Sequence, residues 1–131
     1  MMDFISHQRS GIAVAILLLL LLPACSAHYR IHPGALNATD SAAYDALLIA
    51  QTTIDQARLQ LQAGQLPAEA KTALDVLVRS YNVAREAWLT YRASAARDNA
   101  NLTSPVYFDQ LTKNLSNLTD AIRKFQEVMS K

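Results

Sequence analysis

The residues best suited to binding chemistry lie close together in the second half of the chain, at Arg85, Trp88, Tyr91 and Arg92. On a helix, the i,i+4 spacing of Trp88 and Arg92 lets the guanidinium stack on the indole ring. Such a face can bind a sugar or a peptide, so these four residues form a candidate binding patch. The same spacing fits core positions for Trp88 and Tyr91 with a solvated arginine edge, and we favour this second interpretation.

Side chains that catalyse reactions or bind metals are scarce elsewhere. His28 and His32 are the only histidines beyond the N-terminal region, and Pro33 opposes a helix that would align them. A third ligand is not close in sequence, so no metal site is predicted. The region after residue 39 has neither histidine nor thiol, and its carboxylates are scattered. This composition argues against an enzyme.

The single cysteine of the chain, Cys25, follows a strongly apolar segment. The uncharged run Ile12–Leu22 is shorter than the about 20 residues needed to cross a bilayer, and it fits the apolar part of a secretory signal. We therefore predict a signal peptide at residues 1–24. The alternatives are a plain secretory signal cut at Ala24 or Ala27, and an uncleaved anchor.

The residues Leu22-Pro23-Ala24-Cys25 resemble the lipobox of bacterial lipoproteins. The resemblance implies that Cys25 carries a covalent diacylglycerol, that the chain is cut before it, and that its new amine receives an N-acyl group such as palmitate. Ser26, where a retained lipoprotein would have Asp, implies transport to the outer membrane, facing the periplasm. Membrane lipid is therefore the expected partner at Cys25, because two or three acyl chains anchor a protein stably.

Residues 25–39 lack a helical period and are predicted to form a lipidated tether. Residues 32–48 begin with His-Pro-Gly, which predicts a turn. They resemble a segment of small uncharacterised bacterial lipoproteins, and this resemblance implies no activity. We expect the segment to hold the tether on the helices, with Tyr44 or Asp45 close to Asn37.

The composition indicates an all-α domain of ordinary size. Lys and Arg total 12 and Asp and Glu total 11, for a formal net charge of +1. This balance provides no basic surface for nucleic acid or anionic lipid. Good helix formers such as Ala, Leu, Gln and Arg are plentiful, and strand-like alternation is absent.

Apolar residues recur at alternating spacings of three and four in three segments, which predicts three amphipathic helices. The first runs from Asp40 or Ser41 to Ala63, the second from near Pro67 to about residue 97, and the third from Ser104 onward. We call the apolar line along each predicted helix its seam. The seam of the first helix consists of Leu47, Ala50, Ile54, Ala57 and Leu61, widened by Tyr44 and Leu48. The seam of the second consists of Ala70, Leu74, Leu77, Tyr81, Ala84, Trp88, Tyr91 and Ala95, and that of the third of Phe108, Leu111, Leu115, Leu118, Ile122, Phe125 and Met129.

Short connections make consecutive helices antiparallel neighbours. The predicted fold of residues 40–131 is therefore an up-down-up antiparallel three-helix bundle. An oligomer is the alternative, because seams of this period also suit a coiled coil formed by several copies.

These predictions favour a non-enzymatic envelope lipoprotein whose helical bundle is a structural accessory or binds another envelope protein. No cofactor beyond the covalent lipid is expected. The alternative is a bundle that binds a small molecule or glycan in a groove near Trp88. An exposed apolar strip would support the first function, and a pocket of roughly 300 Å³ or more would support the second.

Overall fold

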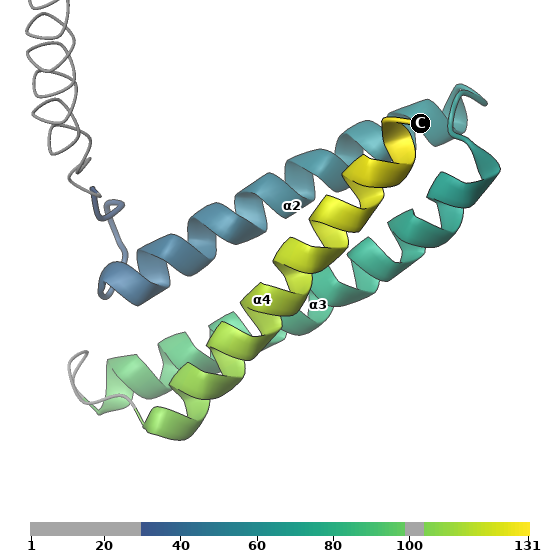
Figure 1. The fold of residues 1–131 in the computed structure, drawn as a ribbon. Helices are drawn as coiled ribbons and strands as arrows, with labels where there is room; N and C mark the ends of the chain where they lie inside the picture. Colours follow the sequence, from purple (N-terminus) through teal and green to yellow (C-terminus); the bar gives the residue numbers. More distant parts are fainter. Residues whose placement is uncertain (1–29, 99–103) are drawn as a thin grey trace, which may run out of the picture. The chain divides into compact units, whose positions relative to one another are not determined.

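The described residues form three helices, and each runs antiparallel to the next one along the chain (Figure 1). The computed structural model describes residues 30–98 and 104–131, so the predicted signal peptide, Cys25 and His28 lie outside the described residues. The helices are α2 (Ala38–Gln62), α3 (Ala68–Arg97) and α4 (Pro105–Met129). α3 packs against both other helices and runs opposite to each. The predicted all-α, up-down-up three-helix bundle is confirmed.

Helix α2 begins earlier than the sequence suggested. Its N-cap is Asn37, whose side chain accepts a hydrogen bond from the backbone N–H of Asp40 at 2.9 Å. The start predicted at Asp40 or Ser41 is therefore wrong, and the last residues assigned to the tether belong to the helix. Several residues in a row here can cap a helix, and contacts made by Asp40 with distant residues decide among them.

The connection between α2 and α3 agrees with the prediction at Gly64. This residue has a left-handed φ of 68°. The N–H of Gln65 donates to the carbonyl of Gln60 at 2.8 Å, and that of Gly64 donates to Leu61 at 3.1 Å. These two bonds form a Schellman motif, which satisfies carbonyls at the end of the helix. The chain can then reverse within a few residues, as an antiparallel pair requires.

The third helix begins where the sequence predicted, with Ser104 as N-cap and Pro105 in the first turn. The Ser104 side chain makes no capping bond. Its carbonyl accepts the N–H groups of Tyr107 and Phe108 instead, at 3.1 and 3.3 Å. Pro105 suits this position because its fixed φ is already helical and it has no N–H to satisfy.

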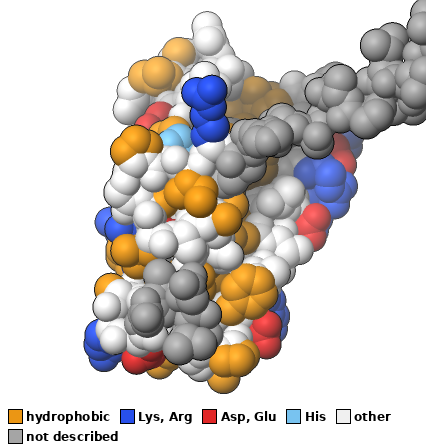
Figure 2. All heavy atoms as spheres, turned by 90° about the vertical axis from the view of Figure 1, so that its left-hand side faces the viewer, with side chains coloured by type: hydrophobic (Ala, Val, Ile, Leu, Met, Phe, Trp, Pro, Cys, Tyr) orange, Lys and Arg blue, Asp and Glu red, His pale blue; other side chains and the backbone are white. Residues whose placement is uncertain are grey.

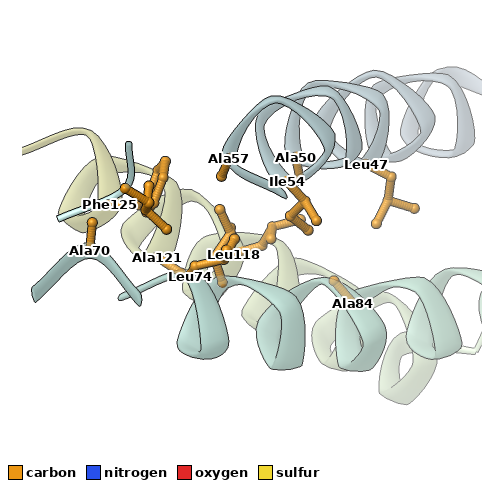
Figure 3. Packing of buried hydrophobic residues seen from close by; sticks show 12 residues of the cluster. Leu47, Ala50, Ile54, Ala57, Ala70, Leu74, Ala84, Leu118, Ala121 and Phe125 are labelled. Carbon is orange, nitrogen blue, oxygen red and sulfur yellow. The ribbon is translucent and has the colours of Figure 1, made fainter. Parts of the chain in front are cut away.

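Most of the predicted seam residues meet in the interior (Figure 3). One buried cluster extends over all three helices and consists of Leu47, Ala50, Ile54, Ala57, Leu66, Ala70, Leu74, Leu77, Ala84, Leu118, Ala121 and Phe125. A second cluster lies toward the beginning of α2 and contains Ala43, Ala87, Tyr91, Ala95 and Leu111. Burial of these side chains is the main favourable contribution to folding.

Four predicted seam positions are exposed instead: Tyr44, Leu48, Leu61 and Phe108. On α2 the buried face alternates alanine with larger residues, so it is narrow and leaves its flanks in solvent. On α4 the neighbouring Tyr107 packs inward in place of Phe108. Periodicity identifies the face of a helix, but the packing partner sets how wide the buried stripe becomes.

The surface in Figure 2 shows small groups of hydrophobic side chains between polar and charged ones. No extended area of one charge is visible on this face. Within the described ranges, no helix combines the length and apolarity that a membrane span requires.

Candidate functional site

Asp40 is a fully buried carboxylate in the first turn of α2, with 0% of its surface exposed. Its Oδ1 accepts a hydrogen bond from the indole Nε1 of Trp88 at 2.6 Å. Its Oδ2 accepts the backbone N–H of Leu36 at 2.8 Å and lies 3.3 Å from the Arg92 guanidinium. A buried carboxylate is tolerated only when such donors replace water. Asp40 therefore joins α2, α3 and the segment that precedes α2.

That segment, residues 31–37, is called the strap below. The backbone N–H of His32 donates to Oγ of Ser41 at 2.9 Å, and the His32 ring is hydrogen bonded to the Asp45 carboxylate. The guanidinium of Arg92 donates to the carbonyl of Gly34 at 3.3 Å. The prediction that this part of the chain is held on the helices is confirmed, so the strap is a docked element of the bundle.

A turn shapes the strap at the position predicted from His-Pro-Gly. The N–H of Ala35 donates to the carbonyl of His32 at 3.0 Å, and Gly34 has a φ of 85°. Proline followed by a residue of positive φ is typical of a type II turn. The turn orients the Gly34 carbonyl toward Arg92, so the local backbone conformation allows the strap to contact α3.

Asn37 has a partner on α3 that the sequence did not suggest. Its side-chain amide donates to the Tyr91 hydroxyl on α3 at 3.0 Å. Asp45 bonds to His32, and the Tyr44 ring lies against the rings of His32 and Trp88, with centroids 5.4 and 6.2 Å apart. The prediction considered residues close in sequence, whereas this partner lies on another helix.

Three residues of the candidate binding patch, Trp88, Tyr91 and Arg92, lie close to the strap, whereas Arg85 lies apart from it. The Arg92 Cζ lies 5.2 Å from the centroid of the Trp88 ring, as the spacing predicted. Tyr91 is only 3% exposed and belongs to the core, the role we favoured for it. Trp88 is half-buried. Arg85 lines a different depression, together with Tyr81 and other residues between α2 and α3.

A cleft of about 250 Å³ lies beside this cluster. Its walls come from the strap, α2 and α3, and its lining residues are His32, Pro33, Gly34, Ala35, Asp40, Tyr44, Trp88 and Arg92. The second depression, of about 140 Å³, lies on the Arg85 side of Tyr44 and Trp88. The polar side chains of the larger cleft have partners, because Arg92 is ion-paired with Asp40 and the His32 ring is hydrogen bonded to Asp45. The arrangement is therefore suited to binding a small, uncharged polar molecule.

The role of Asp40 was missed in the sequence, although a signal for it exists. Asn37 and Asp40 have the spacing of a capping box, in which an acceptor side chain three residues into the helix reaches back toward the preceding backbone. The long-range bonds to Trp88 and Arg92 have no comparable local signal. The pairing of His32 with Asp45 was missed because a tether has no predictable contact with a helix.

Among the described residues, no group of three or more His, Cys, Asp or Glu side chains could hold a metal ion. Comparison with protein-family models, curated proteins and solved structures finds no match for this chain.

Proposed function

We propose that this protein is a non-enzymatic lipoprotein of the bacterial cell envelope. In this proposal residues 1–24 are removed, and diacylglycerol and an N-acyl group on Cys25 anchor the chain in the outer membrane, facing the periplasm. The observation that carries the proposal is the sequence Leu22-Pro23-Ala24-Cys25 directly after an uncharged apolar run. The folded strap follows Cys25 closely, which suits a domain that works at a membrane surface.

The bundle would act as a structural accessory or by contact with another envelope protein. A lipid anchor confines a domain to two dimensions and raises its local concentration, so even a weak contact becomes effective. Isolated exposed apolar side chains on the helices, such as Ile49 and Val83, offer places for such contact. The clefts of the described region are smaller than those typical of drug-sized ligands.

The anchor is tested by mass spectrometry of the native N-terminal peptide and by membrane fractionation. We expect the peptide to begin at Cys25 and to carry acyl chains. Cys25→Ser should release the protein from membranes, whereas Ser26→Ala, a change at the next position, should leave it bound. A native chain that begins at Met1 or has a bare thiol would overturn the proposal.

The choice of membrane is tested at Ser26. If the sorting rule implied by the lipobox resemblance holds, Ser26→Asp should shift the acylated protein from the outer to the inner membrane. Separation of the two membranes on a density gradient measures this shift. Wild-type protein found in the inner membrane would refute the outer-membrane location without affecting the lipidation.

A second candidate function is supported by the cleft beside Trp88. Aromatic rings of Tyr44 and Trp88 and polar groups of His32 and Arg92 converge on about 250 Å³, which suits a ligand about the size of a single sugar ring. Titration with monosaccharides, followed by Trp88 fluorescence, tests this function. Tyr44→Ala should abolish any response, and Leu89→Ala, an exposed change on α3, should preserve it.

A further inference from the structure

The strap fixes where the anchored chain enters the bundle. Hydrogen bonds from His32 to Ser41 and from Leu36 to Asp40 dock it at the N-terminal end of α2. Only seven peptide units separate Cys25 from His32, so a fully extended connection reaches at most about 25 Å. With 25 residues, α2 is roughly 37 Å long. An acylated Cys25 therefore limits how far this end of the bundle can rise above the membrane, whereas the end at Gly64 can stand farther away.

The same end carries exposed apolar side chains at the beginning of α4. Tyr107 and Leu36 both pack against the buried cluster that contains Tyr91 and Leu111, so the first turn of α4 lies at the same end of the bundle as the strap. Its neighbours Val106 and Phe108 are 67% and 43% exposed. This turn contains no acidic residue. We call Val106 and Phe108 the apolar end of the bundle.

Exposed charged residues flank these two side chains, namely Arg97, Asp98 and Asp109. At the distal end of α2, an ion pair lies beside the exposed apolar residue. Leu59 is as exposed as Val106, at 66%, but it follows Arg58, which is ion-paired with Asp55 at 3.8 Å. Burying charged groups in lipid is unfavourable, whereas a valine and a phenylalanine gain free energy when they leave water. The short connection from Cys25 and two exposed apolar side chains thus coincide at one end.

We propose that Val106 and Phe108 insert into the lipid interface and hold the bundle upright on the membrane. This inference rests on the proposed lipidation of Cys25. Two apolar side chains would bind a membrane weakly alone, but the acyl chains keep them at high local concentration beside it. The occupant of the apolar end is therefore the surface of the bilayer that holds the lipid anchor.

The test uses the full acylated protein in phosphatidylcholine vesicles, with a spin label at Val106→Cys. Acylation blocks Cys25, so the introduced thiol is the only reactive one. Leu59→Cys is the matched control, with equal exposure at the opposite end. We expect the label at position 106 to lose its collisions with a water-soluble nickel complex and to retain those with oxygen. The label at position 59 should keep both, and adding Phe108→Ser should make position 106 more accessible to nickel.

Three results would overturn this orientation in acylated protein. Equal nickel accessibility at both positions would place the apolar end in water. Loss of nickel collisions at both positions would mean that the bundle lies flat. Spin–spin broadening between labels at position 106 would mean that a second copy covers the apolar end. Mass spectrometry of the same sample separates these results from a missing acyl chain, which would overturn the proposed function as well.

Discussion

At the residue scale, Asp40 shows how one buried charge can organise several elements. Its two oxygens serve donors from Leu36, Trp88 and Arg92, which belong to the strap and to α3. An apolar residue could fill the same space, but it would leave these donors unsatisfied. The cost of removing Asp40 therefore exceeds the value of any one of its bonds.

Asp40→Asn should destabilise the protein by about 2–3 kcal/mol. In asparagine an NH₂ group replaces one carboxylate oxygen, so N–H groups face donors that have lost their acceptor. The substitution also removes the negative charge that faces Arg92. We place the value below that of a fully buried ion pair, because Arg92 is about one third exposed. Urea denaturation measures the loss. Asp55→Asn, at an exposed pair, is the control and should change stability by less than about 0.5 kcal/mol; an equal effect at both positions would contradict this role.

Leu77→Asp should prevent the bundle from folding. Leu77 is completely buried in the central seam of α3, where an aspartate would have no charged or hydrogen-bonding partner among its apolar neighbours. Its neighbour Val76 is exposed, so Val76→Asp should leave the fold intact. Circular dichroism of the two variants tests the assignment. A cooperative melting transition in Leu77→Asp at the wild-type temperature would mean that the seam is misplaced.

Single residues also mark the limit of prediction from sequence. Leu77 and Leu118 follow from the helical period, because burial repeats with the turn of the helix. Gly64 and Pro105 follow from backbone chemistry, because few residues suit their conformations. The contacts of Asp40 and Asn37 with α3 do not follow, since Trp88, Tyr91 and Arg92 lie far away in sequence and a polar side chain does not indicate which distant residue it will meet.

At the element scale, the turn after α2 depends on backbone conformation alone. Gly64 has a φ of 68°, and a Cβ added there would meet nothing within 4 Å. A substitution at this position is therefore strained without any steric clash with neighbours. The effect of a side chain on the turn can be measured separately from its effect on packing.

Gly64→Ala should cost roughly 1 kcal/mol, the usual strain of alanine in the left-handed region. Gly64→Asn should cost less, because asparagine enters this region more readily. Urea denaturation of both variants measures the difference. A loss of several kcal/mol in Gly64→Ala would contradict the open surroundings of this glycine.

The strap also limits what elements can be predicted. Its turn was visible in the sequence, because proline and glycine have strong conformational preferences. The sequence indicated that the strap contacts the helices, but it did not indicate how many contacts the strap makes. An element without periodicity buries few apolar residues and depends on specific hydrogen bonds. A groove near Trp88 was considered from the sequence, but the wall that the strap contributes to the cleft could not be predicted for the same reason.

At the scale of the whole molecule, the three helices contribute unequally to the core. α3 and α4 share large side chains such as Leu74, Leu111 and Phe125 across their interface, and their contact is the most extensive in the bundle. The buried face of α2 contains many alanines and touches α4 only slightly. Less apolar area therefore leaves water when α2 docks.

Because hydrogen exchange reports local opening, we expect amides of α2 to exchange through a lower free energy of opening than those in the centre of α3. The strap opposes this opening, since its bonds to Asp40 and Ser41 tie the beginning of α2 to the bundle. Protection in α2 should therefore be lowest toward its C-terminal end, beyond Ala57. Native-state exchange at increasing urea concentrations measures the opening free energies. Equal values in α2 and α3 would show that the bundle opens only as one cooperative unit, and that the narrow face of α2 contributes as much as the wider interface of α3 with α4.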